Sequence, residues 1–141
     1  MLELLEKAKN LDMVFQAYGN IACVYVFGSC VKGFSTTDSD IDFAILIRDG
    51  NFRDRAFLAY KIEKALDFVR PVELIVLNHQ KLIFKLNVIK DGKIVYEADR
   101  NYRVRFETDV MRQFHELEPH FQFMEKYYSK GLLRRLGYET T

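Results

Sequence analysis

Two aspartates in the first half of the chain have a spacing that suits binding of a metal ion. Asp40 and Asp42 begin an apolar run that predicts a β-strand over Asp40–Ile47. Because side chains alternate between the two faces of a strand, both carboxylates project from the same face. Adjacent carboxylates repel each other unless a cation lies between them, and oxygen ligands at short spacing favour magnesium. The pair therefore predicts a site for one or two Mg²⁺ ions.

A Gly-Ser pair upstream of the aspartates is suited to phosphate. Gly28 and Ser29 lie between a predicted strand, Ile21–Phe27, and a predicted short helix. Glycine lets a ligand approach the backbone, and a helix N-terminus offers free N–H groups and a positive dipole end. Lys32 and Ser39 are further candidates for nucleotide binding, with a solvated lysine and an ordinary polar loop as the alternatives.

A third carboxylate, Glu73, lies in the predicted apolar strand Val72–Leu77. An acidic side chain in such a strand needs a partner. If this strand lies beside the one that carries the aspartates, Glu73 can complete a carboxylate triad. It would then bind metal and accept the proton of an attacking hydroxyl. The alternative is a salt bridge to Arg70 or to a lysine.

The elements that would position these residues alternate between strand and helix. Strands are predicted over Ile21–Phe27, Asp40–Ile47, Val72–Leu77 and Lys93–Glu97, and helices over Leu2–Tyr18, Arg53–Val69, His79–Ile89 and Asn101–Leu136. This alternation predicts an α/β (α+β) fold with a small mixed sheet flanked by helices.

The spacing of apolar residues and prolines predicts further details of these helices. The buried face of the second long helix is predicted to hold Leu58, Ile62, Ala65 and Val69. Asp91-Gly92 is predicted to form a tight turn, and Pro119 is predicted to kink or split the last helix. The apolar stripe of that helix comprises Phe106, Val110, Leu117, Phe121, Met124 and Tyr128.

The composition fits one domain with a real hydrophobic core. The chain has 141 residues, 49% of them hydrophobic, and 21 Lys+Arg against 20 Asp+Glu. This balance argues against a surface dedicated to nucleic acid, and no apolar run has the length of a membrane span. The N-terminal segment Met1–Asn10 alternates Leu with Glu and Lys and lacks the apolar stretch of a signal peptide, so we expect a cytoplasmic protein. We expect one domain over 1–141, with an α/β core at 1–99 and a helical extension at 100–141.

The motif resembles that of a known family. Gly28-Ser29, ten intervening residues and then Asp40-x-Asp42 is similar to the signature of the DNA-polymerase-β-like nucleotidyltransferase superfamily. The chain length and the helical tail resemble its minimal members, the MNT antitoxins (often called MntA) of HEPN–MNT toxin–antitoxin systems. Glu73 stands where many relatives carry Asp.

This resemblance implies a function. Gly28 and Ser29 would position the phosphates of ATP, Asp40 and Asp42 would bind Mg²⁺, and Glu73 would join them. The reaction would be transfer of AMP to a tyrosine hydroxyl of a HEPN-type toxin, silencing that partner's ribonuclease. The partner would be helical, with neither a membrane nor direct nucleic-acid binding involved, and homo- or hetero-oligomers stay open.

Two other functions stay open. The chain could be a non-catalytic antitoxin that neutralises its partner by steric contact, using aromatic residues of the C-terminal helix that lie off its buried face. Aromatic side chains spread around this helix include Phe114, Phe121, Phe123, Tyr127 and Tyr128. The third function is nucleotidyl transfer to a small molecule. The absence of room for a second substrate domain argues against it.

Overall fold

The protein is built around a mixed four-stranded sheet. The computed structural model describes residues 11–28 and 40–127. The strands are β1 (Ile21–Phe27), β2 (Ile41–Ile47), β3 (Val72–Val76) and β4 (Lys93–Glu97), in the order β3-β2-β1-β4. β2 pairs with β3 in parallel, whereas β1 is antiparallel to both β2 and β4. The predicted mixed sheet is therefore confirmed, and the bounds of β1 and β4 are those predicted.

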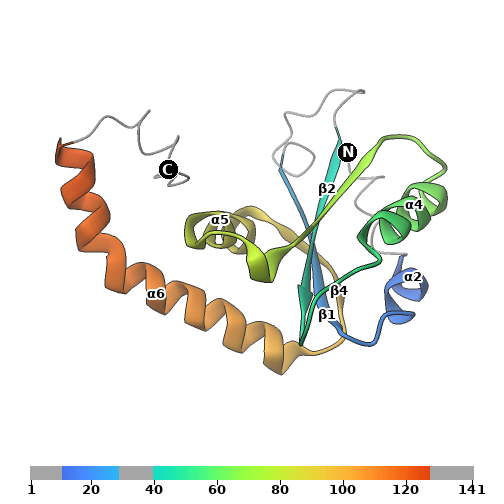
Figure 1. The fold of residues 1–141 in the computed structure, drawn as a ribbon, viewed down its shortest axis with the longest axis horizontal. Helices are drawn as coiled ribbons and strands as arrows, with labels where there is room; N and C mark the ends of the chain where they lie inside the picture. Colours follow the sequence, from blue (N-terminus) through green and yellow to red (C-terminus); the bar gives the residue numbers. More distant parts are fainter. Residues whose placement is uncertain (1–10, 29–39, 128–141) are drawn as a thin grey trace.

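Helices cover both faces of this sheet. They are α2 (Asp12–Gln16), α4 (Arg55–Ala65), the short 3-10 helix η1 (Leu77–His79), α5 (Leu82–Asp91) and α6 (Arg100–Tyr127). α2 and α4 lie on one side of the sheet, and α5 and α6 lie on the other (Figure 1). Within the described part of the chain, no helix combines the length and apolarity needed to cross a membrane.

The sheet separates two hydrophobic cores. The core beneath α2 and α4 includes Phe15, Val24, Phe43, Ile45, Leu58 and Ile62. The core beneath α5 and α6 comprises Cys23, Tyr25, Ala44, Leu46, Leu77 and Val88, with Phe27, Ile75, Tyr102 and Phe106 packed against it. Alternate residues of β1 and β2 thus enter opposite cores. Burial on both faces explains why these central strands are continuous apolar runs in the sequence.

α4 is shorter than predicted, and its buried face differs from the prediction. Leu58 and Ile62 are buried as expected, but Ala65 is exposed, Val69 is 52% exposed, and Leu66 is buried in their place. The reason is backbone geometry, because Asp67 and Phe68 have positive φ angles of 58° and 54°. The Phe68 N–H donates to the Glu63 carbonyl, so the chain leaves the helix and rotates Val69 away from the core.

Other boundaries also move. β3 ends at Val76, because Leu77 begins the 3-10 turn, and α5 starts at Leu82 and not at His79. Asp91 is the last residue of α5 and Gly92 follows it as the C-cap with φ −73°, so the predicted tight turn is wrong. The first helix is predicted over Leu2–Tyr18, and the part of it that the structure describes contains α2, Asp12–Gln16. The short helix and polar loop predicted within 29–39 lie outside the described residues.

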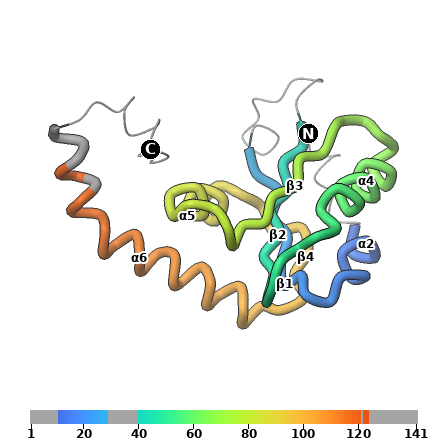
Figure 2. Tube along the Cα trace, viewed as in Figure 1, coloured from blue at the N-terminus to red at the C-terminus, as the bar shows by residue number. Residues whose placement is uncertain are grey.

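α6 continues through Pro119 and is not split there. It does change direction in its outer part (Figures 1 and 2). A bend is expected because Pro119 has no N–H to donate to the helical hydrogen bonds. Val110 is the last buried residue of its apolar stripe, and Leu117 is 42% exposed. The remaining members of the predicted stripe, from Phe121 onward, have side chains outside the described part.

A polar network ties the first turns of α6 to the sheet. The buried Tyr25 hydroxyl of β1 donates to Glu107 Oε1 at 2.6 Å. Arg103 Nη1 donates to Glu107 Oε2 at 3.0 Å, and its Nε pairs with Glu97 of β4. Burial and the bond to Glu107 both raise the pKa of Tyr25, so the hydroxyl keeps its proton. The network therefore fixes α6 against β1 and β4.

Replacement of Tyr25 by Phe should lower the free energy of unfolding by about 1–2 kcal/mol, because a hydrogen bond to a charged acceptor is lost. Tyr96→Phe is the matched control, since the Tyr96 ring packs on Phe15 and no hydrogen bond of its hydroxyl contributes to this network. Urea unfolding of both variants is the measurement. Equal effects of the two substitutions would contradict the importance of the Tyr25–Glu107 bond.

Candidate active site

Two of the predicted acidic residues lie side by side at one end of the sheet. In the parallel β2–β3 pair, Asp42 is the register partner of Glu73. The Ile41 N–H donates to the Pro71 carbonyl at 2.9 Å and fixes this register at the start of both strands. Asp42 is half-buried, whereas Glu73 is exposed on an edge strand. The predicted proximity of the second and third strands is confirmed.

The backbone of Gly28 lies close to the Asp42 carboxylate. It follows β1, has φ +80°, and a Cβ atom placed on it would lie 2.4 Å from Asp42 Oδ2. Any other residue would therefore be strained and would displace the carboxylate. At position 28, the backbone therefore lies directly against Asp42. Ser29, Lys32 and Ser39, the other predicted nucleotide-binding residues, lie outside the described residues.

Like charges perturb the Asp42 carboxyl group. Burial, the charge of Glu73, a hydrogen bond with Glu73 and the charge of Asp40 together raise the pKa of Asp42 to about 6. The protonated Asp42 carboxyl can donate to Glu73, which relieves the repulsion between them. A perturbed acid in contact with a second acid is a frequent feature of functional sites.

The chemistry of these side chains fits a hard divalent cation. All three predicted ligands offer carboxylate oxygens, the donors that Mg²⁺ prefers. Burial and repulsion by the neighbouring acids raise the Asp42 pKa, and a cation would neutralise the repulsion. In residues 11–28 and 40–127, however, no three His, Cys, Asp or Glu side chains form a complete ligand group. Asp40 is exposed and precedes the first residue of β2, so the strand ladder does not fix its side chain.

Arg70 does not neutralise Glu73. Among the described residues, no basic side chain forms an ion pair with Glu73. Arg70 Nη1 is buried without a hydrogen-bond partner. The salt-bridge alternative for Glu73 therefore has no support in this part of the chain.

A separate cavity of about 200 Å³ is lined by Asn51, Phe52, Arg55, Val76, His79 and Gln80. Its lining includes the last residue of β3, whereas Glu73 is near the first. The cavity therefore lies at the opposite end of the parallel strand pair from the carboxylates. None of the predicted site residues lines it.

Sequence reasoning did not single out an aromatic pair beside the carboxylates. Phe27 is the register partner of Asp42 across the β1–β2 pair, and its ring meets that of Phe84 on α5 edge to face at 5.5 Å. In the sequence, Phe27 belongs to an apolar strand and Phe84 to an apolar helix, so both are typical of core residues. Only the strand register and the packing of α5 bring them to the site.

A sequence model of the family described as "Polymerase beta, Nucleotidyltransferase" matches residues 9–101. This match spans more than half of the chain and includes Gly28, Asp40, Asp42 and Glu73. Among curated protein sequences, none matches the chain significantly.

Several solved structures share the fold. A toxin–antitoxin structure with AMP-PNP is 24% identical, with a TM-score of 0.68 over 85% of this chain and 95% of the other. An MntA–HepT complex in which two aspartates, two positions apart, are replaced by glutamate is 21% identical, with a TM-score of 0.70 over 84% and 95%. A tri-AMPylated Shewanella oneidensis HEPN toxin in complex with an MNT antitoxin is 21% identical, with a TM-score of 0.65 over 87% of this chain and 96% of the other.

Replacing Asp42 by Asn should stabilise the metal-free protein at neutral pH. The pKa of Asp42 is raised from 3.8 to about 6 in the folded state. Folding therefore favours the protonated form, and this carboxyl group destabilises the fold progressively as the pH rises through 4 to above 6. In EDTA, we expect the melting temperature of Asp42→Asn to exceed that of the unmodified protein by roughly 3–6 °C at pH 7.5, and by little at pH 4.

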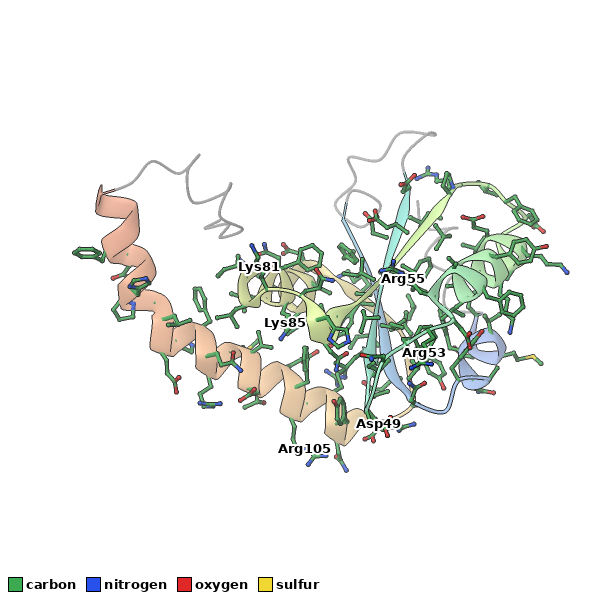
Figure 3. All side chains as sticks on the ribbon, viewed as in Figure 1. Asp49, Arg53, Arg55, Lys81, Lys85 and Arg105 are labelled. Carbon is green, nitrogen blue, oxygen red and sulfur yellow. The ribbon has the colours of Figure 1, made fainter. Side chains whose placement is uncertain are left out.

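Asp49→Asn is the matched control for this measurement. Asp49 is exposed beyond the far end of β2, and Figure 3 shows it at the lower end of the sheet. Its substitution should leave the melting temperature unchanged at both pH values. If Asp42→Asn destabilises the metal-free protein at pH 7.5, the repulsion described here is wrong.

Proposed function

This chain belongs to the polymerase-β-type nucleotidyltransferase family, and from that membership we propose that it transfers AMP from ATP to a tyrosine hydroxyl of a HEPN-type toxin. The transfer would make it the antitoxin of that partner. The observation that carries the proposal is the placement of Asp42 beside Glu73, next to the backbone of Gly28. Phosphate binding and acid–base chemistry would then act at one end of the sheet.

The roles of the chain's residues follow from this arrangement. The backbone at Gly28, with Ser29, would hold the triphosphate, with Lys32 and Ser39 as further contacts. The acceptor oxygen would form a bond to the α-phosphorus while the bond to the β-phosphate oxygen breaks, releasing pyrophosphate. Glu73 is exposed at the sheet edge, where an incoming hydroxyl can reach it, and would accept the hydroxyl proton. Asp42, fixed on β2, would be a ligand of the metal ion.

The proposed site would also bind Mg²⁺. Asp42 and Glu73 would hold it together with Asp40, and it would supply neutralisation of the charge that develops on the phosphates. The raised pKa of Asp42, which burial and its acidic neighbours cause, supports this role, because a dication at the pair would restore the ionised form.

The similar complexes support a HEPN-type protein as the acceptor. One of them contains a tri-AMPylated HEPN toxin beside its MNT antitoxin, and another contains the ATP analogue AMP-PNP. In this chain, we propose residues 1–99 as the catalytic core and 100–141 as the extension that meets the partner. The outer part of α6 suits that role, since Met111 and Leu117 are 44% and 42% exposed.

The proposal is tested by incubating the protein with ATP, Mg²⁺ and a HEPN-type partner and measuring the partner's intact mass. We expect a gain of one or more AMP units. Asp42→Asn and Glu73→Gln should each lower the initial rate of transfer by at least about 100-fold, because each removes a carboxylate that acts in the transition state.

Asp49→Asn serves again as the control and should transfer AMP at the unmodified rate. Undiminished transfer by Asp42→Asn would overturn the assignment of the site. A partner that stays bound and inhibited with no gain in mass would favour the steric antitoxin, for which the exposed residues of α6 are the supporting observation. A partner that is neither bound nor modified, together with AMP transfer to a small hydroxyl compound, would favour the third function.

A further inference from the structure

The Phe27–Phe84 pair lies on the face of the sheet that carries the carboxylates. Residues directly opposite in an antiparallel pair point to the same face, so Phe27 and Asp42 share one. Phe27 packs against the core that α5 and α6 cover, which identifies this face. The aromatic pair therefore borders the candidate active site on the side of α5.

Phe84 packs on Phe27 and still keeps part of its surface exposed to solvent. Its side chain is 36% exposed although it is one of the larger apolar residues of α5, whose buried residues are Ile83 and Val88. Its ring meets Phe27 edge to face, with 5.5 Å between ring centroids and an interplanar angle of 82°. In this arrangement one ring supports the other at a fixed angle, while part of the Phe84 surface stays open to solvent.

We propose that Phe84, supported by Phe27, forms the surface on which the base of the bound nucleoside triphosphate stacks. This inference rests on the proposed function, because it places the phosphates at Gly28 and Asp42. The base of a nucleotide is separated from its α-phosphate by the ribose. Phe27 is one strand spacing, about 5 Å, from Asp42, and the Phe84 ring centroid is 5.5 Å from that of Phe27. These two short steps put Phe84 within reach of a base whose phosphates lie at Gly28 and Asp42.

The character of the surface determines what it can recognise. Stacking on a phenylalanine ring uses the π-face that every base has, and Phe offers no hydrogen-bonding group to read a base edge. Phe84 would therefore contribute affinity for the nucleoside part of the substrate. It would favour purines, which have the larger ring area, without separating ATP from GTP.

The test is direct binding, measured by isothermal titration calorimetry with ATP and, separately, with inorganic tripolyphosphate, both in Mg²⁺. Phe84→Leu should weaken ATP and GTP binding by about 5- to 100-fold, the usual range for loss of one base–aromatic stack. The same variant should bind tripolyphosphate as the unmodified protein does. Phe84→Tyr keeps the aromatic face and should restore ATP affinity.

Phe57→Leu is the matched control, because Phe57 is an exposed aromatic residue of α4 on the other side of the sheet. It should leave both affinities unchanged. Unaltered ATP binding by Phe84→Leu would overturn this inference and leave the proposed function standing. Equal weakening of ATP and tripolyphosphate would also overturn it, since Phe84 would then only support the fold. Failure of the unmodified protein to bind ATP would overturn both.

Discussion

The parallel pairing of β2 with β3 determines the geometry of the candidate site. It sets Asp42 opposite Glu73 and so holds two carboxylates together despite their repulsion. Such an arrangement is stable only if the surrounding structure fixes it. β2 is buried on both faces between the two cores, and its register with β3 is fixed by the Ile41–Pro71 hydrogen bond. The cores therefore hold the charged pair in a position that it would not adopt alone.

The two faces of the sheet therefore differ: one is closed by helices, and the other carries the candidate site. α2 and α4 close the core on the face away from Asp42, and α4 leads directly to the start of β3. α5 and α6 cover the face that carries the carboxylates, yet they leave its Asp42–Glu73 end accessible at Phe84 and Glu73. The Tyr25–Glu107–Arg103 network fixes α6 to this same face.

The sequence predicted the features that come from periodicity and from a fixed motif. β1 and β4 were correct to the residue. The alternation of side chains along β2 turns Ile41 and Phe43 into the core and Asp42 to the other face. The proximity of Glu73 to Asp42 followed from one assumption, that the second and third strands are neighbours. That assumption was sound because a helical crossover joins parallel strands that commonly lie side by side.

The features that the sequence did not predict depend on local backbone strain or on tertiary packing. No propensity indicates that Asp67 and Phe68 adopt positive φ angles, and this conformation ended α4 early and exposed Val69. The sequence left open whether Pro119 would kink or split α6, and the helix bends in its outer part without a break (Figure 1). The contact between Phe27 and Phe84 requires both the register of β1 with β2 and the docking of α5, and neither is encoded in a short motif.

Binding of one cation between Asp42 and Glu73 at the end of the sheet can be measured with Mn²⁺, a spectroscopic substitute for Mg²⁺. Electron paramagnetic resonance would follow the ion in the presence of a non-hydrolysable ATP analogue. We expect bound Mn²⁺ with the unmodified protein and with Asp49→Asn, and at least about tenfold weaker binding with Asp42→Asn and with Glu73→Gln. Equal Mn²⁺ binding by all four proteins would show that the two carboxylates form no such site.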